Sequence, residues 1–199
     1  MAFRTRLPLI ALACVVTAAS AERNDAWDQL RPLLEQASPP AVFEAPFVQQ
    51  LTSPLLRGTE TSTGRFRRDA DAMVWVTDTP TATTTRIDYT ARTVTLTDHA
   101  TGTVETHPFE PDPLMAALLT LDAEQIAAAA DLEAFDHRPD ADELAVTLRP
   151  HDSATLTAMA VTLDLQRHVP TKLRLTHADA TETRIRFMTP DESMPSEQH

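Results

Sequence analysis

The sequence has 199 residues and a formal net charge of -12 at pH 7, from 17 lysines and arginines against 29 aspartates and glutamates. A chain this acidic repels the phosphates of nucleic acids and anionic lipid headgroups, which argues against a nucleic-acid-binding protein. Its length suits one domain with a sizeable core. Cys14 is the only cysteine, so stability must come from packing rather than from an internal disulfide.

The N-terminal segment has the three parts of a secretory signal peptide. Two arginines precede the apolar run Leu7 to Val16, and small residues end in an A-x-A pattern at Ala21. The run is shorter than the ~20 residues of a membrane-spanning helix. We therefore predict a cleavable signal peptide over residues 1–21 and a mature protein in the periplasm. The alternative is a lipoprotein acylated at Cys14, although Ala11 replaces the leucine expected three residues before that cysteine.

One short amphipathic helix is expected at the start of the mature chain. Trp27, Leu30 and Leu34 recur near helical spacing within Asp25 to Ala37. The prolines that follow remove backbone donors and end the helix. The polar tail over residues 189–199 is expected to be disordered, which leaves residues 22–188 as the folded domain.

From Val42 onward, apolar and polar residues alternate, which indicates β-strands. Turn residues such as Asp69-Ala70-Asp71 and Gly64 separate the runs, as in antiparallel hairpins. Pro46 is expected to confine the first strand to a sheet edge or a bulge. The later strands are expected over residues 143–148, 156–165, 171–175 and 183–187. The prediction is an α+β fold with about ten strands.

The stretch Pro113 to Asp131 interrupts the alternation with a helical pattern. Its first part carries an apolar stripe of Leu114, Met115, Leu118, Leu119 and Leu121. Asp122 and Gln125 resemble a capping box that starts a second short helix. Such an insertion can simply cover the open face of the sheet, or it can act as a lid on an apolar cavity.

The motifs of several enzyme classes are absent from the sequence. It contains no G-x-S-x-G, no H-E-x-x-H and no glycine-rich phosphate loop, and it has only three glycines. We therefore predict a protein that is not an enzyme and needs no cofactor. His99 and His107 could face each other across a hairpin as a zinc site, but exposed turn residues are the simpler interpretation. The acid pairs Asp69/Asp71 and Asp140/Asp142 are likewise interpreted as solvated turns rather than as calcium ligands.

Several short motifs follow one another along residues 27–188. After the first helix comes the F-x-Q sequence Phe47-Val48-Gln49. A glycine starts the next strand in Gly64-Arg65-Phe66, and Trp75 precedes Pro80 with four residues between them. Leu148-Arg149-Pro150 and the final Arg184-Ile185-Arg186-Phe187 complete the series. In this order and spacing the motifs resemble the LolA-like lipoprotein carriers of the bacterial periplasm, although Arg68-Asp69-Ala70-Asp71 replaces the arginine-proline turn of that family.

The resemblance implies an unclosed antiparallel β half-barrel whose helical lid encloses acyl chains. The implied function is a periplasmic carrier or chaperone for lipoproteins or other lipids. The implied partners are the acylated cargo, an inner-membrane exporter and an outer-membrane acceptor. The resemblance, combined with the alternation of apolar and polar residues, predicts a set of ligand-binding residues: Phe47, Phe66, Trp75, Ile87, Met115, Leu118 and Leu119. Arg68 is implied as a contact to the lid. The protein is expected to be a monomer.

Two other functions stay open at this point. A secreted interaction or scaffold domain could have the same architecture with a filled core, since fold alone does not give function. A hydrolase would be indicated by an activity that a single polar substitution near Asp98 or His107 abolishes. Uptake of a hydrophobic probe separates the carrier from the scaffold.

Overall fold

A single antiparallel sheet and three α-helices make up the structure, a computed structural model that describes residues 13–37, 40–110 and 113–189. The N-terminal half contains α1 (Ala13–Gln36), β1 (Phe43–Thr52), β2 (Thr59–Arg68), β3 (Ala72–Thr79), β4 (Thr83–Asp88), β5 (Thr93–Asp98) and β6 (Thr103–Pro108). The C-terminal half contains α2 (Pro113–Thr120), α3 (Ala123–Ala129), β7 (Ala130–Arg138), the 3-10 turn η1 (Pro139–Ala141), β8 (Glu143–Pro150), β9 (Leu156–Asp164), β10 (Val169–His177) and β11 (Glu182–Phe187). The α+β class, the unclosed sheet and the helical insertion are confirmed, with eleven strands instead of ten.

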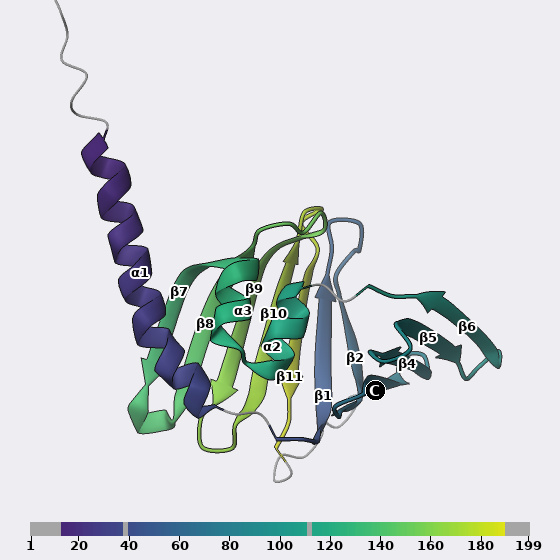
Figure 1. Ribbon diagram of the computed structural model, residues 1–199. Helices are drawn as coiled ribbons and strands as arrows, with labels where there is room; N and C mark the ends of the chain where they lie inside the picture. The colour runs from purple at the N-terminus through teal and green to yellow at the C-terminus, as the bar shows by residue number, and fades with distance from the viewer. Residues whose placement is uncertain (1–12, 38–39, 111–112, 190–199) are drawn as a thin grey trace, which may run out of the picture.

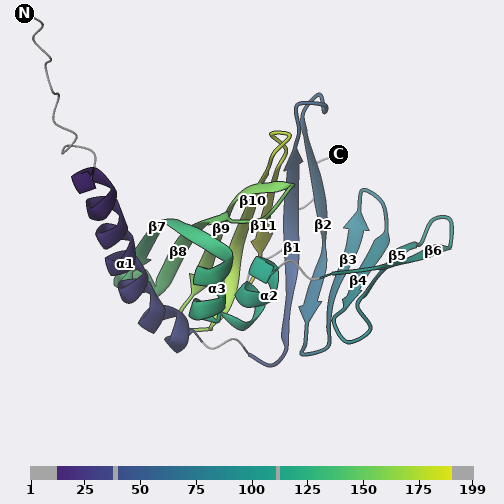
Figure 2. The ribbon, with the colours of Figure 1, turned by 45° about the horizontal axis from the view of Figure 1, so that its top comes forward.

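The strand order is β6-β5-β4-β3-β2-β1-β11-β10-β9-β8-β7. Two antiparallel meanders meet where β1 pairs with β11, in a register that places Phe47 opposite Phe187. The first and last strands are therefore central, while β6 and β7 form the two edges. Figures 1 and 2 show α2 and α3 over one face of this curved sheet, with α1 beside β7 and with β4 to β6 extending away from the helices.

The helical insertion forms where the sequence predicts it, between β6 and β7. The Asp122 carboxylate accepts hydrogen bonds from the backbone N–H groups of Glu124 and Gln125, both at 3.0 Å. These bonds satisfy two of the donors that open α3. Leu121, between the two helices, has a φ of 52°, a left-handed conformation that L-residues rarely adopt. This sharp turn folds α3 back against α2.

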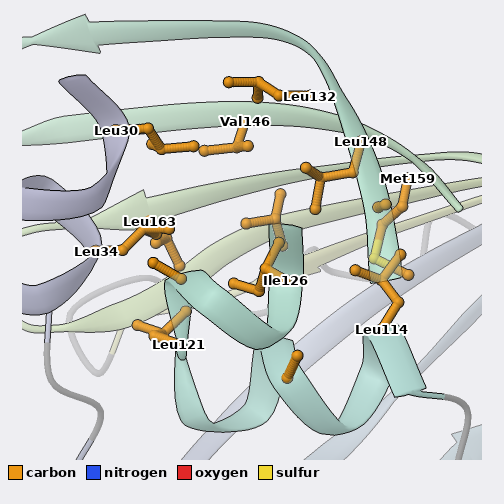
Figure 3. Close-up of a cluster of buried hydrophobic side chains, with 14 of the residues drawn as sticks. Leu30, Leu34, Leu114, Leu121, Ile126, Leu132, Val146, Leu148, Met159 and Leu163 are labelled. Atoms are coloured by element: carbon orange, nitrogen blue, oxygen red, sulfur yellow. The ribbon is translucent and has the colours of Figure 1, made fainter. Parts of the chain in front are cut away.

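Within the described residues, the core consists of two hydrophobic clusters. The first, here called the helix cluster, joins α1, α2 and α3 to the inner face of β7, β8 and β9, and Figure 3 shows Leu30 and Leu34 of α1 converging with Ile126 of α3. The second, the aromatic cluster, contains Phe47, Phe66 and Phe187 on β1, β2 and β11. Leu173 of β10 packs against both clusters, so they meet over the middle of the sheet.

The prediction that Pro46 confines β1 to an edge or a bulge is wrong, because β1 is paired on both sides. The Pro46 carbonyl accepts a hydrogen bond from the N–H of Met188, at 2.8 Å. A strand residue directs its N–H and C=O to the same side, so the missing donor of Pro46 faces the end of β11. The ladder with β11 begins one residue later, at Phe47, and the pairing with β2 is continuous.

Other boundaries also differ from the sequence predictions. Gly64 lies within β2 rather than in a turn. The first helix ends at Gln36, close to the prediction, but it already begins at Ala13 and includes Pro32. Residues 1–12 of the predicted signal peptide and residues 190–199 of the predicted tail lie outside the described residues.

Candidate ligand-binding cavity

A mainly apolar cavity of about 90 Å³ lies between α2 and the inner face of the sheet. Its lid side is formed by Leu118 of α2 and by Leu121 of the turn between the helices. Its floor continues over three alternate residues of β9, Met159, Val161 and Leu163, which share one face of the strand. On this side, the cavity wall is therefore formed by residues of the helix cluster.

The opposite wall consists of aromatic rings from the aromatic cluster. Phe66 of β2 faces Trp75 of β3 with ring centroids 4.3 Å apart, and these residues are direct partners in the strand register. Phe43 and Phe187 add rings whose centroids lie 5.7 Å and 5.2 Å from that of Phe66. Tilted and edge contacts at these distances are the favoured aromatic arrangements. The wall is thus broad and apolar, and the rings hold one another in place.

Arg68 and His168 are the polar exceptions among the described residues that line the cavity. The Arg68 Nη2 atom donates a 2.8 Å hydrogen bond to the carbonyl oxygen of Pro40, which precedes β1. Burial lowers the pKa of Arg68 from its ordinary value, yet a guanidinium keeps its charge at any ordinary pH. Burial also raises the pKa of nearby Tyr89, to about 12. The positive charge of Arg68 acts in the opposite direction and lowers that pKa, but its effect is smaller.

His168 lies in the turn between β9 and β10 and has a φ of 58°. Its Nδ1 atom is buried and has no hydrogen-bond partner among the described residues. An unsatisfied buried polar atom costs about 1–3 kcal/mol. A ligand with a suitable polar group would recover that cost.

The structure brings together some of the predicted ligand-binding residues. Phe66, Trp75 and Leu118 line the cavity, as does Arg68. Phe47 and Ile87 belong to the aromatic cluster but are not among the described lining residues. The side chains of Met115 and Leu119 lie outside the described part of the structure. The roles of all these residues in binding, and a contact of Arg68 with the lid, stay predictions.

Sequence reasoning missed much of the floor and one of the two polar groups. Met159, Val161 and Leu163 were part of a predicted strand, and their alternation could have identified them as facing inward. Phe43 and Phe187 follow the same rule on β1 and β11. His168 carries no signal in the sequence, because only the turn geometry directs it to the cavity.

The opposite face of the sheet carries a second, more open hollow of about 560 Å³. It is lined by basic side chains of β10 and β11, namely Lys172, Arg174, Arg184 and Arg186. Glu182 forms ion pairs with Arg174 and Arg184. Burial acts to raise the pKa of Glu182, but hydrogen bonds from the two arginines hold it below its ordinary value. This hollow is a polar surface feature, unlike the apolar cavity beneath the lid.

The zinc interpretation of His99 and His107 is wrong, because the two residues lie at opposite ends of the β5–β6 hairpin. His107 is the register partner of Val94 at the start of β5, whereas His99 follows the end of that strand. His99 contacts the Thr84 hydroxyl at 2.8 Å, and His107 lies 3.4 Å from a Glu105 oxygen. Across the described ranges, no three histidine, cysteine or acidic side chains are grouped to hold a metal ion. Nor does any helix in these ranges have the length and apolar character needed to span a membrane.

No protein-family model and no curated protein matches the chain. Among solved structures, a DUF1329 family protein from Desulfovibrio piger is 9% identical with a TM-score of 0.45, over 86% of this chain and 95% of that chain. MucB in its complex with MucA from Pseudomonas aeruginosa is 17% identical with a TM-score of 0.43, over 82% of this chain and 55% of that chain. A LolA superfamily protein from Nitrosomonas europaea is 8% identical with a TM-score of 0.41, over 79% of this chain and 90% of that chain. The family that the sequence motifs resemble is thus among the similar structures, but at these TM-scores we draw no functional conclusion from the similarity.

Proposed function

We propose that this protein is a non-enzymatic periplasmic carrier or chaperone that holds the acyl chain of a lipoprotein or another lipid beneath the helical lid. The observation that carries the proposal is the cavity itself, whose wall joins the leucines of the lid to the aromatic rings of the sheet. An apolar cavity with few polar groups is typical of sites for hydrophobic ligands. Acyl binding of this kind requires no catalytic group.

The cavity has to widen to hold an acyl chain. At about 90 Å³ it is smaller than the ~150 Å³ cavity that accepts benzene in an engineered protein, and smaller than the ~300–1,000 Å³ of common ligand sites. The lid is suited to such a movement, because α2 packs on α3, and α3 in turn packs on α1 and β7. Displacement of α2 from the sheet would open the cavity toward the aromatic wall.

The energetics support a reversible carrier. Burial of about ten methylene groups at about 0.8 kcal/mol each contributes about 8 kcal/mol, which corresponds to a dissociation constant near the micromolar range. The free energy needed to open the lid reduces this affinity. Binding of this strength permits both uptake and release of the cargo.

Mass spectrometry of organic extracts tests the proposal directly. The protein is expressed from its full gene in a bacterial host, purified from the periplasm without detergent and extracted. We expect a stoichiometric acylated compound, and an intact protein mass that begins after Ala21. A clean extract, together with no saturable binding of a fluorescent fatty acid, would contradict the carrier function.

Leu118→Glu places a carboxylate in the cavity wall and should abolish binding of the fluorescent fatty acid. Leu118→Trp fills the cavity with an apolar side chain and should weaken binding without introducing a charge. Leu55→Glu is the matched control, because Leu55 is 91% exposed in the loop between β1 and β2. Circular dichroism confirms that each variant is folded. Undiminished binding by folded Leu118→Glu and Leu118→Trp would refute the site.

The second candidate is a secreted interaction domain, and the basic hollow on the opposite face is the observation that favours it. A basic surface in a chain of net charge -12 is suited to an acidic partner. This function predicts that the cavity takes up no lipid and that Arg184→Glu abolishes capture of the partner. Lipid uptake by the wild-type protein would favour the carrier function over the interaction domain.

A further inference from the structure

The two polar groups of the cavity have no use in binding an acyl chain. A chain of methylene groups is satisfied by the leucines and aromatic rings, and a charged or unsatisfied polar group in the wall opposes its burial. Arg68 and His168 nevertheless both line this cavity. Their presence indicates a ligand with a polar end as well as an apolar chain.

Arg68 supplies a fixed positive charge. It is the last residue of β2, two positions beyond Phe66 on the same face of the strand, so it continues the aromatic wall. The hydrogen bond to the Pro40 carbonyl holds its side chain at the cavity. A half-buried guanidinium favours an anion with oxygen acceptors, because its donors match a carboxylate or a phosphate.

His168 supplies a directed polar atom on the other meander of the sheet. The left-handed turn between β9 and β10 sets the position of the ring, and the Nδ1 atom is buried without a hydrogen-bond partner in the described structure. Buried polar atoms are nearly always satisfied, so an orphan atom at a cavity indicates a missing partner. With its proton on Nδ1, the ring donates a hydrogen bond to an oxygen atom.

We propose that the cargo is a single-chain amphiphile with an anionic oxygen headgroup, a carboxylate or a phosphate, bound between Arg68 and His168 with its chain beneath α2. This inference rests on the proposed carrier function and specifies its ligand class. A single chain needs the least widening of the cavity, which measures about 90 Å³ in this structure. Arg68 binds the charge, and His168 donates to a second oxygen of the same headgroup.

Displacement of Nile red, a neutral apolar dye, tests the headgroup separately from the chain. The competitors share one chain length and differ in their ends: palmitate, hexadecyl phosphate and hexadecanol. We expect the better of the two anionic lipids to displace the dye at about tenfold lower concentration than hexadecanol, as one charge-assisted hydrogen bond permits. Whichever anion is stronger identifies the headgroup as a carboxylate or a phosphate.

Three variants test which residues cause the preference for anionic lipids over hexadecanol. Arg68→Met should remove the preference, so that the anionic lipids displace the dye no better than hexadecanol does, whereas Arg68→Lys should keep part of the preference. His168→Phe should weaken anion binding severalfold. Arg65→Met is the matched control, because Arg65 is exposed on the opposite face of the same strand. Thermal melts establish that every variant is folded.

The outcomes separate this inference from the carrier function. Equal displacement by the anionic lipids and hexadecanol, or an undiminished preference in folded Arg68→Met, would overturn the headgroup assignment while leaving the carrier intact. Failure of all three lipids to displace the dye would overturn both. An anion preference that is lost in Arg68→Met and kept in Arg65→Met supports the assignment.

Discussion

β2 and β3 approach each other so closely at Gly64 that no side chain fits between them. A Cβ atom added to Gly64 would lie 2.0 Å from the carbonyl oxygen of Val76 and 2.9 Å from the Thr77 Cα. Both obstructing atoms belong to the backbone, so a change of rotamer cannot relieve the clash. Gly64→Ala therefore has to separate the two strands that carry Phe66 and Trp75.

The expected cost of Gly64→Ala follows from that separation. Overpacking of a closely packed site costs about 1–3 kcal/mol, and each hydrogen bond lost from the ladder adds about 1 kcal/mol. With one hydrogen bond lost, we expect a decrease of about 2–4 kcal/mol in the free energy of unfolding, a large share of the ~5–15 kcal/mol that stabilises a typical domain. Urea unfolding followed by tryptophan fluorescence measures it, since Trp75 lies on the disturbed strand.

Gly58→Ala is the matched control for this prediction. A Cβ atom on Gly58 meets nothing within 4 Å, and the residue has no positive φ. The same substitution there should be neutral or should stabilise the protein by up to about 1 kcal/mol, because alanine lowers the conformational entropy of the unfolded chain. The reasoning fails if Gly64→Ala unfolds at the wild-type urea concentration, or if both variants lose the same stability.

Three further predictions concern the lid and the aromatic cluster. Leu114→Ala removes a fully buried anchor of α2 and should cost about 2–5 kcal/mol in urea unfolding, whereas Leu55→Ala in an exposed loop should change stability by less than about 0.5 kcal/mol. Asp122→Ala should lower the melting temperature at neutral pH, whereas Asp122→Asn, which keeps a capping oxygen, should lower it less. Because the hydrogen bond from the Gln125 backbone holds the pKa of Asp122 below its ordinary value, the contribution of this carboxylate is complete above its unfolded-state pKa and is lost as the pH falls through its folded-state pKa. Tyr89 is the only tyrosine, so ultraviolet titration should show a single phenol with a pKa of about 12 in the folded protein and about 10 in denaturant. Its contribution to stability is complete below the unfolded-state pKa and is lost as the pH rises toward the folded-state value.

Each of these predictions has a result that would contradict it. Equal losses in Leu114→Ala and Leu55→Ala would show that the lid is not anchored as described. A melting-temperature difference for Asp122→Ala that persists unchanged in strong acid would exclude the charged cap as its cause. A Tyr89 titration that is identical in folded and denatured protein would exclude burial of the phenol.

Local patterns predicted those elements whose faces differ in polarity. β1 alternates between buried and exposed residues, and Asp122 caps a helix in both the sequence pattern and the structure. The residues of β6 show no such alternation, because all six are exposed at the edge of the sheet. β7 was hidden for another reason: a shift in register between Leu132 and Ala134 interrupts its alternation.

The site was only partly predictable, because long-range pairing assembles it. Phe66 and Trp75 come from adjacent strands, so their alternation sufficed to place them on one face. Phe187 joins them only because β11 pairs with β1, which is distant in the sequence. The spacing of residues along the sequence does not predict that pairing. The inward position of His168 depends on a left-handed turn, which the spacing does not predict either.

The position of the cavity at the junction of the two clusters would allow the proposed lid movement without unfolding of the domain. Leu118 and Leu121 belong to the helix-cluster side of the wall, whereas Phe66 and Trp75 belong to the aromatic cluster. Movement of α2 away from the aromatic rings would break contacts between the clusters and the contacts of α2 with the sheet, but it would leave the aromatic cluster and the packing of α3 on α1 and β7 in place. An acyl chain inserted at that junction would restore the lost apolar contacts, so in the proposed carrier the open form is favoured only while cargo is bound.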